Sequence, residues 1–345
     1  MRKFSAIGIS AVLLSLLAGC HPYEEFKDTP EGNFDALWTL MDEHYCFFQE
    51  KEIDWNGVHD IYSARIVPGM TRREYFKTCA QMLDTLRDGH VNLSSSFDVS
   101  YYRKWWTDYP QDFNLRTLQE NYLKFDYSTI SGICYKWMPG NIAYIYIGSF
   151  STPIGESNLD WILDYFKDCV AMVIDVRNNG GGMLTNVETL VGRFIDEEIC
   201  AGYIRHKTGP GHNDFSEPRA VVYKPTYGRH HWPSRPVVVV TNRSCFSAAN
   251  DFVSVMKSLP NVVIVGAHTG GGSGMPFSGE LPNGWSVRFS ACPMTDARGR
   301  SIEEGIDPTF GCEVHSPDDE LARGIDRILD FALAKARDMH ATGKW

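Results

Sequence analysis

Residues 171–182 read AMVIDVRNNGGG, a short apolar run that ends in charged and amide side chains and then in three glycines. A continuous apolar run of this length is typical of a strand that is buried on both faces. The pattern recurs at residues 237–250, VVVVTNRSCFSAAN, where we expect a helix to follow the polar loop. Two buried strands, each leading through a polar turn into a helix, predict an α/β fold with a buried sheet.

The rest of the chain divides into regions of different pattern. Apolar side chains recur at helical spacing within residues 33–95, which we expect to form an N-terminal helical cap. Residues 96–140 are rich in aromatic side chains without a clear period, and we interpret them as an irregular linker. Strand and helix patterns then alternate over residues 141–340, the predicted core, which carries an insertion at residues 198–235.

The N-terminus is typical of an exported lipoprotein. A basic start precedes an apolar run at residues 6–17, which is shorter than the roughly 20 residues that a membrane-spanning helix needs. The tetrad LAGC at residues 17–20 then resembles a bacterial lipobox, in which cleavage precedes the cysteine and the cysteine is acylated. We expect residues 1–19 to be a signal peptide, Cys20 to anchor the chain at the outer membrane or cell surface, and residues 20–32 to be a tether. An ordinary signal peptide that ends in a chance cysteine is the alternative.

Composition limits the partners and cofactors. The formal net charge is −10, and loss of the two cations in the signal peptide makes it −12, which disfavours nucleic acid and anionic lipid headgroups as partners. Eight cysteines follow Cys20 without a C-x-x-C pair, so we expect mostly buried free thiols, with room for one disulfide, and no zinc site. Four histidines around the insertion also lack metal-ligand spacing: His206, His212, His230 and His231. No metal and no cofactor is predicted.

Ser247 is the strongest candidate for a nucleophile. It follows a polar loop and begins the helix that is predicted over residues 247–259. A serine at a helix N-terminus lies beside unpaired N–H groups and the positive end of the helix dipole. Such groups can stabilise the oxyanion that forms in acyl transfer. Serine is also a preferred N-cap residue, and from the local sequence alone plain capping is the simpler explanation.

Two other segments could contribute to the same chemistry. His90 follows a helix predicted over residues 71–86, which we expect to stop at Asp88-Gly89, where glycine suits a left-handed end. The histidine could reach a cleft between cap and core and act as a general base, or it could be an ordinary surface histidine. The glycines at 180–182 allow backbone amides to approach a ligand, or they form only a flexible turn.

Three segments together resemble one family. Residues 175–182, residues 244–250 and the run Gly305-Ile306-Asp307-Pro308 are similar to those of the tail-specific, or C-terminal processing, peptidases and the tricorn core peptidases. The resemblance spans roughly residues 30–335. It implies an α/β core related to crotonase and Clp protease, below the helical cap.

The resemblance also implies a set of site residues. It places the nucleophile at Ser247 rather than at Ser244. The oxyanion hole would consist of the backbone amide of Ala248 and an amide of the glycine run, at Gly181 or Gly182.

The general base departs from the bacterial C-terminal processing pattern, which uses a lysine roughly 25 residues after the serine. Glycine occupies that position here, and no lysine lies between Lys257 and Lys335. The tricorn-like branch uses an earlier histidine and a later glutamate, which match His90 and either Glu303 or Glu304. We favour Glu303, whose carboxylate would orient the imidazole and stabilise the imidazolium.

These features predict a serine peptidase of the bacterial cell envelope that hydrolyses peptides or unfolded protein tails through an acyl-enzyme. The interval between His90 and Asn141 is too short for the PDZ domain that many family members carry. Two alternatives remain. A non-catalytic peptide-binding or ligand-binding protein could use the same scaffold, because a fold does not certify activity. A thioesterase-like acyl hydrolase would use the same nucleophile.

Overall fold

The computed structural model describes residues 26–226 and 235–345. The predicted signal peptide, residues 20–25 of the tether with the lipidation site at Cys20, and His230 and His231 therefore lie outside the described residues. Within the described ranges, every helix is too short or too polar to cross a membrane.

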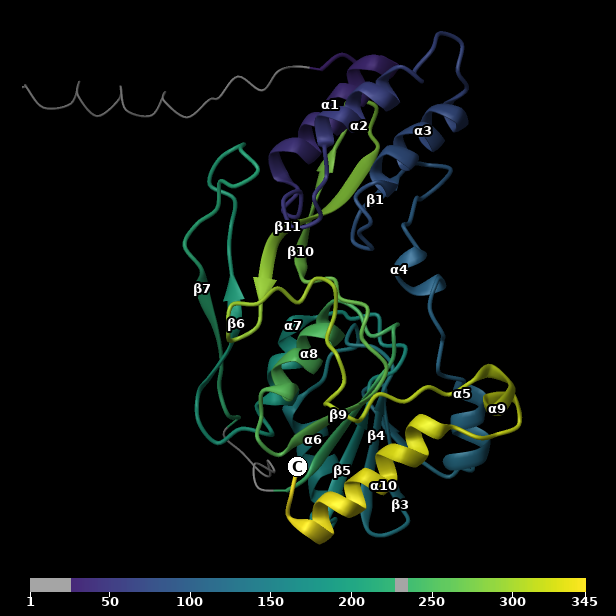
Figure 1. The fold of residues 1–345 in the computed structure, drawn as a ribbon, viewed down its shortest axis with the longest axis vertical. Coiled ribbons are helices and arrows are strands. Elements are labelled where there is room, and N and C mark those ends of the chain that lie inside the picture. Colours follow the sequence, from purple (N-terminus) through teal and green to yellow (C-terminus); the bar gives the residue numbers. More distant parts are fainter. Residues whose placement is uncertain (1–25, 227–234) are drawn as a thin grey trace, which may run out of the picture.

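A six-stranded sheet forms the centre of the larger lobe (Figure 1). Its strands, in spatial order, are β2 (Ser128–Ile130), β3 (Ile133–Met138), β4 (Ile142–Ile147), β5 (Ala171–Asp175), β8 (Val237–Thr241) and β9 (Val262–Gly266). The last four strands are parallel, and β2 and β3 add an antiparallel edge. All residues of β5, β8 and β9 are buried, which explains why their sequences are apolar runs up to Asp175 and Thr241 at the ends of β5 and β8.

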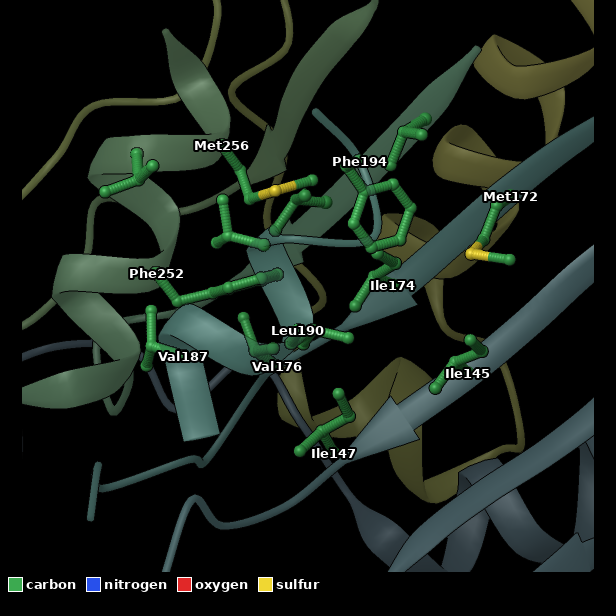
Figure 2. Close-up of a cluster of buried hydrophobic side chains, with 14 of the residues drawn as sticks. Ile145, Ile147, Met172, Ile174, Val176, Val187, Leu190, Phe194, Phe252 and Met256 are labelled. Carbon is green, nitrogen blue, oxygen red and sulfur yellow. The ribbon is translucent and has the colours of Figure 1, made fainter. Parts of the chain in front are cut away.

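Helices cover both faces of this sheet. One face packs against α6 (Glu156–Tyr165), α7 (Leu184–Val191) and α8 (Ala248–Lys257), and the other against α10 (Arg327–Thr342). Side chains of β5 alternate between these faces, since Met172 and Ile174 join the first core and Ala171 and Val173 the second. Figure 2 shows the first core, in which Ile174 lies among side chains of α7 and α8. The buried α/β sheet expected from residues 171–182 and 237–250 is therefore present.

A smaller lobe contains the N-terminal helices (Figure 1). It combines α1 (Pro30–His44), α2 (Trp55–Ser63) and α3 (Arg72–Asp84) with β1 (Asn92–Ser94), β10 (Gly274–Glu280) and β11 (Ser286–Thr295). Strand β11 pairs with β1 and β10, and its far end pairs with β6 (Ile199–Ile204), which pairs with β7 (Arg219–Tyr223). The helical cap thus shares one hydrophobic core with strands from the C-terminal half of the chain.

Local capping explains where the cap helices begin. Thr29 accepts a hydrogen bond from the Gly32 amide at the start of α1, and proline follows it at the first helical position. Thr71 and Glu74 form a reciprocal capping box at the start of α3. Both starts follow from side chains that can satisfy the free amides of a first helical turn.

The expectation of an irregular linker needs correction, and the structure adds detail to two other regions. Residues 96–140 are not wholly irregular, because they supply β2 and β3 as well as short helices: α4 (Lys104–Thr107), α5 (Leu115–Thr117) and the π-helical turn η1 (Leu118–Tyr122). The insertion at 198–235 contains the β6–β7 hairpin, which extends the second sheet. The C-terminal segment forms two helices, α9 (Asp318–Ala322) and α10. Most of these strands pair with neighbours in the chain, as β2 does with β3, β3 with β4, and β6 with β7, and only the pairing of β6 with β11 joins distant segments. The sequence of these stretches lacks a clear period, so the strands were not predicted.

The prediction that Gly89 adopts a left-handed conformation at the end of α3 is also wrong. Arg87, rather than Gly89, adopts the left-handed backbone conformation, with φ of 51°. Gly89 is required for a close contact instead, because a Cβ there would lie 2.5 Å from the indole nitrogen of Trp105 and 3.0 Å from Phe246. The glycine therefore lets the segment before His90 pack tightly beside Phe246.

All eight cysteines that follow Cys20 are free thiols, and six of them are buried. Burial raises the pKa of Cys245 to about 12, so this thiol remains protonated. The disulfide for which the sequence left room does not form between any of these eight residues.

Candidate active site

Ser247 connects the loop after β8 to helix α8 in a backbone conformation that is rare for a residue with a side chain. Its φ is 56° and its ψ is −123°. Backbone strain of this kind costs about 1–3 kcal/mol and persists only where the surroundings fix it. Here the Ser247 amide donates to the Gly271 carbonyl at 2.8 Å, and its carbonyl accepts from the Asp251 amide at 3.0 Å. The Ser247 side chain makes no capping hydrogen bond in the described structure, so plain N-capping does not explain the residue.

His90 contacts this hydroxyl directly. Its Nε2 lies 3.0 Å from Oγ of Ser247, within the range expected for a nucleophile and its general base. The imidazole is buried and packs against the Phe246 ring, with 4.7 Å between centroids. Burial lowers the pKa of His90 to about 4 despite the opposing charge of Asp88, so the ring is neutral at neutral pH and able to accept a proton.

The structure places Glu303 against Lys51 and not against the imidazole. The Nδ1 atom of His90 is buried and has no hydrogen-bond partner among the described residues. Oε1 of Glu303 lies 2.8 Å from Nζ of Lys51, and Oε2 accepts a hydrogen bond from the Ser273 amide at 2.7 Å. The alternative, Glu304, is exposed, and its backbone carbonyl accepts a hydrogen bond from His268. Within the described ranges, neither glutamate hydrogen-bonds to His90.

Lys51 and Asp88 are the site residues that the sequence analysis missed. Lys51 is buried, pairs with Glu303, and lies 3.9 Å from Oδ2 of Asp88. Asp88 accepts hydrogen bonds from the His90 amide at 2.7 Å and from the Ser290 hydroxyl at 2.8 Å. Asp88 precedes His90 by two positions, which was the available signal, whereas nothing local distinguishes Lys51.

The two carboxylates beside Lys51 differ in acidity. Burial, reinforced by the charge of Asp88, raises the pKa of Glu303 to about 7, although Lys51 opposes this shift. Burial also disfavours ionisation of Asp88, but the charges of Lys51 and His90 and the hydrogen bond from the His90 amide outweigh it. They hold the pKa of Asp88 below its usual value. Asp88 is therefore the ionised carboxylate nearest in sequence to the base.

The amides predicted for the oxyanion hole meet beside Ser247. A Cβ on Gly181 would lie 2.9 Å from the Ala248 nitrogen, and Gly181 has a φ of +96°. The Gly181 amide is already engaged, because it donates to Oδ1 of Asn179 at 2.9 Å. Gly182 and Ala248, in contrast, line the cavity next to Ser247. This geometry favours Ala248 and Gly182 as the oxyanion donors. Gly181 is needed instead because only a glycine fits so close to Ser247 and Ala248.

A cavity of about 370 Å³ opens beside the nucleophile. Its polar lining includes Asp251 and Arg288 together with Ser247. Its apolar walls come from Met183, Leu184, Met275, Pro276, Met294 and Ile302. Apolar walls with a few polar groups are typical of a site that accepts one side chain of a ligand.

Other predicted groups have structural roles. The buried Arg177 pairs with Asp175 at 2.7 Å and with Asp326 at 2.8 Å, which ties the end of β5 to the start of α10.

Ser244 is not brought to His90, whose side-chain hydrogen bond goes to Ser247. In residues 26–226 and 235–345, no group of three or more His, Cys, Asp or Glu side chains could hold a metal ion.

Comparison with known proteins identifies the family. Residues 141–311 match peptidase family S41, and residues 26–84 match the tricorn protease C1 domain. A crystal structure of a protein assigned as a peptidase, from Parabacteroides merdae ATCC 43184, is 46% identical, covers 90% of this chain and 97% of that chain, and has a TM-score of 0.84. The chain belongs to peptidase family S41.

Two more distant proteins are also similar to this chain, one in sequence and one in fold. The carboxy-terminal processing protease CtpA of Bacillus subtilis is 25% identical over 194 residues, which is 56% of this chain and 39% of that protein. The chain thus spans about two fifths of that relative's length. The crystal structure of mature CPAF shares the fold at 12% identity, with a TM-score of 0.68 over 91% of this chain and 98% of that chain.

These findings confirm three expectations. The family is that of the C-terminal processing peptidases, with a tricorn-type segment at the N-terminus. The fold is the mixed α/β fold of S41 peptidases, related to crotonase and Clp protease, with an N-terminal helical region. S41 peptidases are serine hydrolases, which is the predicted enzyme class.

Proposed function

We propose that this S41 protein is an active serine peptidase that hydrolyses peptides or unfolded protein tails through an acyl-enzyme. The supporting observation is the 3.0 Å contact between Nε2 of His90 and the uncapped hydroxyl of Ser247. His90 takes the hydroxyl proton as Oγ attacks the scissile carbonyl, and then gives that proton to the leaving amine. Water hydrolyses the resulting ester by the same route.

The oxyanion of each tetrahedral intermediate is held by backbone amides. Ala248 supplies the first amide of α8, where the helix dipole adds positive potential, and Gly182 supplies the second from the turn after β5. Preorganised donors of this kind are typically worth 10²–10³ in kcat each.

Asp88 is the positioning carboxylate for His90 in this proposal. It accepts the His90 amide at 2.7 Å and its charge favours the imidazolium that forms during attack. Glu303 acts indirectly, because it forms an ion pair with Lys51, which in turn lies near Asp88. The direct contact between Glu303 and the imidazole that the tricorn-like pattern implies is absent from the described structure, so Glu303 is not assigned to that role.

A fluorophosphonate probe tests the proposal, since it esterifies only activated serines. The wild-type protein and Ser244→Ala are expected to be labelled, and Ser247→Ala is expected to remain unlabelled. Folded wild-type protein that is not labelled would indicate a binding protein instead. A labelled protein that cleaves acyl thioesters but no peptide would indicate the thioesterase alternative.

We also propose that the chain is anchored to the cell envelope by lipid on Cys20. The support is the sequence: a basic start, a short apolar run and the tetrad at residues 17–20. Expression of the full chain in bacteria with radiolabelled palmitate is expected to label the wild type, and Cys20→Ala is expected to carry no label. Equal labelling of both would exclude Cys20 as the anchor.

A further inference from the structure

Asp251 is a buried acid that the proposed mechanism does not use. It lies on α8, one helical turn after Ser247, and lines the same cavity. Only 8% of its surface is exposed, and its Oδ2 accepts a hydrogen bond from the Tyr223 hydroxyl at 2.9 Å. Among the described residues, no lysine, arginine or histidine forms an ion pair with it.

A buried carboxylate without a counter-ion is costly, because burial removes hydration that one neutral hydrogen bond replaces only in part. Burial raises the pKa of Asp251 to about 6, and the Tyr223 hydrogen bond opposes this shift. The carboxylate is therefore mostly ionised at pH 7 and above. A cation that enters the cavity would supply the counter-ion that the Asp251 carboxylate lacks.

The charged side chains described around the cavity do not act as a counter-ion to Asp251. Arg288 of β11 also lines the cavity. Its side chain is exposed and interacts with Asp88, on the side of Ser247 where His90 lies. Glu188 of α7 lies on the Tyr223 side and adds negative charge there. The field around Asp251 thus favours a positive group.

We propose that Asp251 selects substrates with a lysine or arginine side chain on the acyl side of the scissile bond, which deepens the proposed peptidase function and depends on it. The apolar walls formed by Met183, Met275 and Met294 suit the methylene stem of such a side chain, while its charged end meets the carboxylate. The cavity of about 370 Å³ is large enough for either side chain.

The test uses peptidyl-coumarin substrates that differ only in the residue before the coumarin: lysine, or its uncharged analogue norleucine. At pH 8 the wild type is expected to prefer lysine at least about tenfold in kcat/KM, the scale of one charge-assisted contact. In Asp251→Asn this ratio is expected to fall to about one. Each ratio is taken within one variant, so a general loss of activity cancels. Asp338→Asn, an exposed acid on α10, is the matched control and retains the preference.

A second measurement separates recognition from a merely structural role. The lysine preference of the wild type is expected to disappear as the pH falls through about 6, because protonated Asp251 no longer attracts a cation. Tyr223→Phe removes the hydrogen bond that lowers this pKa, so the midpoint of the loss is expected to move upward.

The outcomes distinguish this inference from the proposed function. Hydrolysis of both substrates without a lysine preference, or an unchanged preference in Asp251→Asn, overturns the role of Asp251 and leaves the peptidase intact. Absence of hydrolysis together with absence of fluorophosphonate labelling overturns the peptidase itself.

Discussion

The Nζ atom of Lys51 lies 2.8 Å from Oε1 of Glu303 and 3.9 Å from Oδ2 of Asp88, and all three side chains are almost completely buried. Lys51 follows α1, Asp88 precedes the base, and Glu303 follows β11. One cation therefore joins three remote parts of the chain, one of which carries His90. Because the ions are desolvated, removing the cation would leave two uncompensated carboxylates.

Lys51→Met is expected to lower the free energy of unfolding by about 3–5 kcal/mol, the usual cost of breaking a buried ion pair. Urea unfolding followed by circular dichroism measures the loss. Arg116→Met serves as the control, because Arg116 pairs with Glu120 at 2.7 Å on the surface, where solvent screens the pair. A Lys51→Met protein as stable as the control variant would contradict the structural role of this cluster.

His90→Ala is expected to reduce kcat at least 10²-fold, since it removes a base in direct contact with Oγ of Ser247. Steady-state hydrolysis of the norleucine substrate measures the effect. His340→Ala, at an exposed histidine of α10, is the control and is expected to retain activity. Near-normal turnover in His90→Ala would remove this residue from the mechanism.

The acid limb of kcat/KM for the norleucine substrate is expected to lie well below pH 6.5. Burial lowers the pKa of His90 to about 4, so the neutral, active form of the base persists to lower pH than a free histidine would allow. Arg288 contributes to this lowering, and Arg288→Gln is therefore expected to move the limb upward. A wild-type limb at or above pH 6.5, or an unmoved limb in the variant, would count against the buried neutral base.

Gly181→Ala is expected to lower kcat by about 10²–10³, the scale of losing one oxyanion donor, because the new side chain would displace the Ala248 amide. The new Cβ would collide with Cβ of Ser247 at 2.8 Å and with the Ala248 nitrogen at 2.9 Å, in a backbone conformation that disfavours side chains. The neighbouring Gly180→Ala is the matched control, because nothing lies within 4 Å of a Cβ there. Comparable kinetics and fluorophosphonate labelling in both variants would mean that the oxyanion site tolerates the displacement.

Much of the core could be predicted because its signals are local. Apart from Asp175, the runs at residues 171–176 and 237–240 are apolar on both sides, as buried parallel strands require, and each ends where a sheet presents its ligand-binding edge. Ser247 was found because strand, polar loop and helix follow one another directly in the chain. In contrast, β3 was missed because it lies in the aromatic-rich stretch without a clear period, although its partners are adjacent in the chain. The pairing of β11 with β1 and β6 could not be predicted, since those partners are remote in the chain.

The sequence by itself determined the α/β class, the family and the serine at the start of α8, because short-range periodicity and adjacent motifs carry that information. Tertiary structure decided that His90, which the local sequence left open as a surface histidine, meets that serine across 157 positions, and it paired Glu303 with Lys51 rather than with the imidazole. It also decided which of two neighbouring glycine amides remains available to a substrate. These outcomes depend on desolvation and on distances of a few ångström between remote segments, which no local pattern encodes.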